Sequence, residues 1–229
     1  MRNQLVSEVA RRYEGPTSLT ILVRLACEDR DTRSGWSHRR RSRQAVAVAL
    51  LADLERAGAV AVIDSHLHLV DADTVAARLA SRHAPAVVHA LTAARPLTLA
   101  GSIAAMEGPA DRVSWDLLIR DGDARDRRRP GCELTNTSAT HWWRMILATA
   151  PRNTRLWPVA VALWAILAEA GLHEGLCEDV QKAYRDTMPP GVVLELLLPL
   201  HRSWARVLPR RHARATPRPL PFAAARRRR

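Results

Sequence analysis

A tryptophan and a group of arginines lie close together in this 229-residue sequence: Trp36, then Arg39, Arg40, Arg41 and Arg43. We call the four arginines the arginine cluster. Guanidinium groups pair with phosphate oxygens in bidentate geometry, and tryptophan favours the membrane–water interface. The cluster and Trp36 could therefore hold an anionic lipid headgroup. They could also form a solvated charged loop, and spacing alone favours that simpler interpretation.

The sequence His66-Leu67-His68-Leu69 is the second candidate for chemistry. Alternate residues of a strand share one face, so both imidazoles could reach one metal ion, as in metal-dependent hydrolases of the amidohydrolase superfamily. That fold is a βα barrel of about 250 residues that opens with this strand. Only 161 residues follow His68, and their pattern is helical. We therefore keep the hydrolase as a third hypothesis and expect no metal. The simpler interpretation is that both histidines face solvent from a hairpin strand.

Nucleic-acid binding is the runner-up, because a helix followed by a hairpin and flanked by arginines is typical of a winged helix. The helix in question is predicted over 44–57. After Gln44 it offers only Asp53, Glu55 and Arg56 to a groove, and phosphate would repel the two acids. The arginine cluster precedes this helix, where it would reach the nucleic-acid backbone alone.

The elements that would position these residues are mainly helical. A stripe formed by Val46, Leu50, Leu51 and Leu54 predicts the helix over 44–57, with Asp53 outside the stripe and Gly58 as its C′ cap. Period-two alternation on both sides of Asp64-Ser65 predicts a β-hairpin near residues 59–70. Asp73 is expected to cap a helix over 74–83.

Further short helices are predicted up to Pro109 and from Ala139 onwards, with a short apolar segment over 113–120. Four tryptophans on the later helices are expected to pack in the core or at an interface: Trp142, Trp143, Trp157 and Trp164. Residues 121–136 have mixed charge and no periodicity, which predicts a loop or a boundary between two lobes. The expected fold is therefore mainly α: one helical domain over 1–207 with a small hairpin, followed by a disordered basic tail over 208–229.

Composition agrees with a globular domain that carries two basic segments. The chain has 35 Lys and Arg against 23 Asp and Glu, a net charge of +12, and 47% hydrophobic residues. Eight arginines lie in the tail and four in the arginine cluster, so the remainder is close to neutral. Three widely spaced cysteines and the absence of 18 consecutive apolar residues indicate a cytoplasmic protein, attached peripherally at most to the inner face of the membrane.

Five segments follow one another in an order that resembles a known family. They are an apolar run entering an acidic turn at 19–30, a leucine-rich helix at 49–60, the end of a hairpin at 68–72, and two C-terminal stretches at 151–155 and 165–172. Their order across residues 18–175 resembles the Golgi phosphoprotein 3 family, which includes many actinobacterial members. The resemblance implies a mostly helical fold without a catalytic site or cofactor.

Eukaryotic members of that family bind phosphatidylinositol 4-phosphate at membranes and act as adaptors. Their headgroup pocket uses a tryptophan shortly after the acidic turn, which Trp36 matches within a residue or two. It also uses an arginine of the following helix, and Ala45 to Ala49 offer none, so the arginine cluster would have to supply the anion contacts. We therefore expect a non-enzymatic peripheral module that binds anionic lipid headgroups, of phosphoinositide type by resemblance. Its expected partner is an anionic membrane lipid.

Overall fold

The computed structural model describes residues 18–29, 35–93, 98–126, 132–152, 155–173, 176–189, 191 and 193–197. Helices dominate this part of the chain, and a small antiparallel hairpin follows the longest N-terminal helix, so the mainly α prediction is confirmed. The tail over 208–229 lies outside the described residues. No helix among the described residues has both the length and the apolar character needed to span a bilayer.

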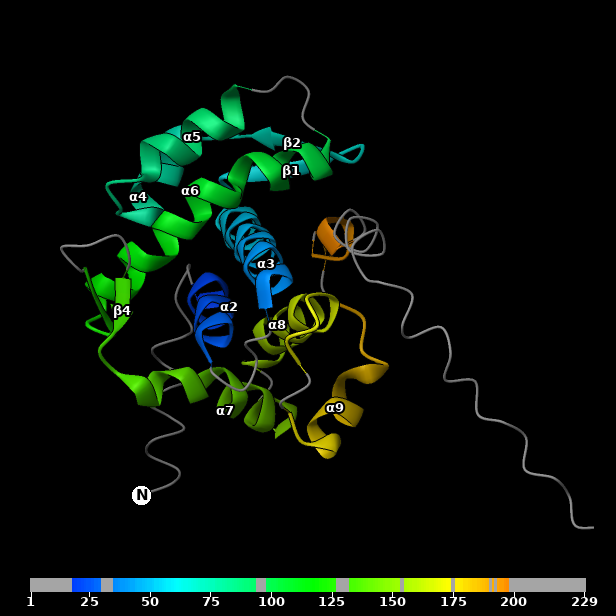
Figure 1. Cartoon of the computed structure of the whole chain (residues 1–229). Coiled ribbons are helices and arrows are strands. Elements are labelled where there is room, and N and C mark those ends of the chain that lie inside the picture. The colour runs from blue at the N-terminus through cyan, green and yellow to red at the C-terminus, as the bar shows by residue number, and fades with distance from the viewer. Residues whose placement is uncertain are drawn as a thin grey trace, which may run out of the picture.

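Two helices form the middle of the fold, α2 (Ser18–Glu28) and α3 (Gly35–Arg56). They pack against each other, against α6 (Leu99–Arg120) on one side, and against α8 (Trp157–Glu169) on the other, as Figure 1 shows. The second half of α3 consists of small and medium apolar residues, and every side chain from Ala45 to Ala52 is at most 1% exposed. A helix that is apolar on all sides must be covered on all sides, which accounts for its central position.

The structure corrects two predictions about this helix. α3 begins at Gly35 rather than at residue 44, so the arginine cluster lies inside the helix and not before it. No proline or internal glycine interrupts 36–44, and arginine is a good helix former, but the cluster carries no apolar stripe that could have revealed the helix. Asp53, expected outside the buried stripe, is only 1% exposed. The predicted cap is confirmed: Gly58 has a φ of 71°, and Ala59 N–H donates to the Leu54 carbonyl at 2.9 Å.

The predicted hairpin is formed by β1 (Val60–Ile63) and β2 (His66–Leu69), which pair antiparallel with Val60 opposite Leu69. Asp64 and Ser65 make the two-residue turn, both with positive φ, as a tight hairpin with the usual strand twist requires. Leu67 faces the core and His68 faces solvent.

Three helices follow: α4 (Ala72–Leu79), α5 (Ala84–Thr92) and α6. The N-cap of α4 is Asp71, whose carboxylate accepts from Asp73 N–H at 2.9 Å, so the predicted cap was two residues too late. Pro109 lies within α6 instead of preceding a separate segment at 113–120. Burial of Met106, Ala110 and Val113 against neighbouring helices outweighs the one backbone hydrogen bond that proline removes.

Residues 121–136 contain a second hairpin where a loop was predicted. β3 (Ala124–Asp126) pairs antiparallel with β4 (Cys132–Leu134). One ion pair of the segment crosses this hairpin, because Arg125 lies opposite Glu133 and donates to its carboxylate at 3.0 Å. Two strands of three residues are too short to leave a recognisable alternation.

The remaining elements are the 3₁₀ turns η2 (Thr137–His141) and η3 (Ala150–Arg152) and the helices α7 (Trp142–Thr149), α8 and α9 (Glu178–Arg185). The ring of Tyr184 stacks on two tryptophans. Its centroid lies 5.3 Å from that of Trp157 and 5.7 Å from that of Trp164. The Tyr184 hydroxyl donates to the Leu147 carbonyl at 2.8 Å. The four tryptophans pack in or against the core, as predicted.

Candidate anion-binding surface

The arginine cluster occupies the N-terminal half of α3. Arg39, Arg40 and Arg43 are exposed and Arg41 is half-buried. Positions three and four apart share one side of a helix, so Arg43 lies beside both Arg39 and Arg40. Trp36 is in the first turn of α3, and its side chain lies outside the described part of the structure.

No acidic side chain neutralises the arginine cluster within the described residues. The first acid of α3 is Asp53, more than two turns beyond Arg43. Some arginines elsewhere have partners, such as Arg125 with Glu133 and Arg144 with Asp29. An anion from outside the described residues could relieve the repulsion among these like charges.

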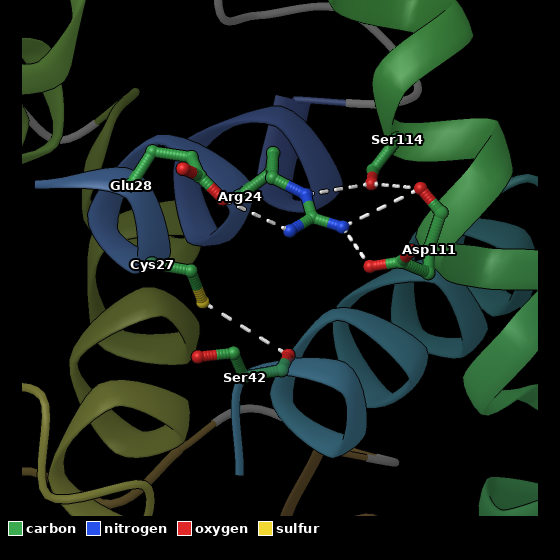
Figure 2. Close-up of polar contacts among 6 residues, drawn as sticks. All are labelled: Arg24, Cys27, Glu28, Ser42, Asp111 and Ser114. Carbon is green, nitrogen blue, oxygen red and sulfur yellow. Dashed lines mark hydrogen bonds and ion pairs between the residues drawn. The ribbon is translucent and has the colours of Figure 1, made fainter. Parts of the chain in front are cut away.

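A buried polar network around Arg24 fixes α2 to α6 (Figure 2). Arg24 of α2 is 4% exposed, and its Nε donates to Ser114 Oγ at 2.9 Å. Its guanidinium also pairs with Asp111 of α6 and with Glu28 at 3.3 Å. Burial acts to lower the pKa of Arg24, but the two carboxylates raise it above its ordinary value. Arg24 is therefore already neutralised and does not belong to the anion-binding surface.

Cys27 lies one turn from Arg24 on α2 and its thiol contacts the Ser42 carbonyl of α3 at 3.9 Å. Burial raises the pKa of this thiol to about 11, although the nearby Arg24 acts to lower it. The thiol consequently stays protonated at neutral pH and unreactive.

Asp53 joins α3 to the start of α2. Its Oδ2 accepts from Thr20 N–H at 2.8 Å and from Thr20 Oγ1 at 2.7 Å, which satisfies a donor at the helix N-terminus as a cap would. Its Oδ1 has no hydrogen-bond partner, and Arg56 Nη1 lies 3.7 Å away. Burial raises the pKa of Asp53 to about 7, against the opposing effect of the Thr20 hydrogen bonds.

The other end of α2 is held by Asp29, which is 2% exposed. Its carboxylate accepts from Trp143 Nε1 at 3.2 Å and from Arg144 Nε at 3.0 Å. The sequence did not predict the buried polar contacts of Arg24, Asp53 and Asp29. The available signal was a single charged or polar residue within an otherwise apolar run, as for Arg24 in α2.

The two histidines of the hairpin are not brought to a metal-binding group. His66 Nδ1 lies 2.7 Å from the carbonyl of Asp64, and His68 points to solvent. Within the described part of the chain, no three His, Cys, Asp or Glu side chains are grouped closely enough to bind a metal. The hydrolase hypothesis therefore gains no support from this geometry.

The winged-helix hypothesis requires the helix before the hairpin to enter a DNA groove. That stretch is the second half of α3, which is covered by α2, α6 and α8. Of α3, the first half with the arginine cluster is left to contact nucleic acid, and arginine can bind both phosphates and guanine edges.

Comparisons with protein-family models, with curated proteins and with solved structures found no match. Function is therefore inferred from the residues of this chain and their geometry.

Proposed function

We propose that this protein is a non-enzymatic peripheral membrane module that binds anionic lipid headgroups through the arginine cluster of α3. The observation that supports the proposal is that Arg39, Arg40 and Arg43 are exposed on one helix with no acidic partner among the described residues. Arginine pairs with phosphate through two parallel hydrogen bonds, so these side chains suit phospholipid headgroups.

The position of Trp36 adds to the argument. It belongs to the first turn of α3, one to two turns from the arginines, and tryptophan is a residue type that favours the membrane–water interface. A basic residue near an anionic leaflet contributes about 1 kcal/mol, so the three exposed arginines together give weak, salt-sensitive and reversible binding. The resemblance of the motif order to the Golgi phosphoprotein 3 family supports the same function.

Flotation with vesicles tests the proposal. The protein should float with vesicles that contain phosphatidylglycerol and stay behind with pure phosphatidylcholine, and added salt should release it. Equal flotation with both vesicle types, or with neither, would contradict the proposal. Duplex DNA serves as a competitor in the same assay. Sequence-selective binding to DNA that persists at high salt would favour the nucleic-acid alternative, because phosphate contacts alone cannot read sequence.

A further inference from the structure

We draw no further inference here: the strongest candidate, the exposed apolar end of the β1–β2 hairpin at Ile63, carries nothing because no feature of the described residues shows what covers it.

Discussion

Replacing Asp53 with asparagine should change how the stability of this protein depends on pH. Asp53 is buried, and its carboxylate accepts two hydrogen bonds from Thr20 through one oxygen, while the other oxygen has none. Asparagine keeps an acceptor for Thr20 and cannot titrate. The variant therefore removes the charge and leaves the anchor between α2 and α3 in place.

The size and sign of the effect follow from the pKa. Burial raises the pKa of Asp53 to about 7, from a value of 3.8 in the unfolded chain. Between these pH values the folded state binds the proton more tightly, so the contribution of Asp53 to stability is complete below pH 3.8 and is lost as the pH rises to about 7. Each pH unit corresponds to about 1.4 kcal/mol, so the loss is about 4 kcal/mol at most.

Urea unfolding of both proteins across this pH range provides the assay. Other carboxylates affect both proteins alike, so the difference in unfolding free energy isolates Asp53. We expect Asp53→Asn to gain stability relative to the wild type as the pH rises from 4 to 7, and no further change above about pH 8. The reasoning would be refuted if the unfolding free energies of the two proteins changed in parallel with pH. It would also be refuted if the wild type became more stable relative to the variant as the pH rises, as expected for a carboxylate whose pKa is lowered by a salt bridge.

Three further predictions concern the same two helices. Arg24→Met leaves the partners of a buried arginine without their counter-charge, so urea unfolding should show a loss of about 3 kcal/mol; a loss below about 1 kcal/mol would contradict the network. Iodoacetamide should label the exposed Cys177 in the folded protein and Cys27 only after unfolding, as peptide mass spectrometry can show, because burial raises the pKa of the Cys27 thiol to about 11. Thr20→Val removes a hydrogen bond that lowers the pKa of Asp53, so the loss of stability with rising pH should end at a higher pH than in the wild type.

The periodic parts of the fold could be predicted from sequence. The stripe of Leu50, Leu51 and Leu54 identified the second half of α3, and alternation around Asp64-Ser65 identified the hairpin. The alternation comes from burial of one face of the hairpin, and the apolar second half of α3 comes from burial on all sides. The second hairpin has strands of three residues, too short to repeat an alternation, and its cross-strand contact between Arg125 and Glu133 leaves no local pattern.

The candidate site was predicted only in part. The residue types of the arginine cluster could be read from the sequence, but their place inside a helix could not, because the polar stretch from Ser37 to Gln44 has no apolar period. Burial of Asp53 depends on Thr20, which is 33 residues away in sequence. Such contacts are decided by tertiary packing, which a single sequence does not display.

The central claim is that the exposed arginines of α3 bind anionic lipid. The direct test compares two triple variants that lose the same charge. The first replaces the three exposed members of the arginine cluster by glutamine: Arg39, Arg40 and Arg43. The second replaces three exposed arginines on α4, α6 and α9 that have no ion pair within the described residues: Arg78, Arg112 and Arg185.

The measurement is the partition coefficient onto phosphatidylglycerol vesicles at fixed ionic strength. With about 1 kcal/mol per basic residue before screening, the first variant should bind at least about tenfold more weakly than the wild type. The second should bind within about threefold of the wild type, because charges beyond a Debye length from the membrane contribute little. Equal losses in both variants would show that net charge alone drives binding, and wild-type affinity in the first variant would contradict the claim outright.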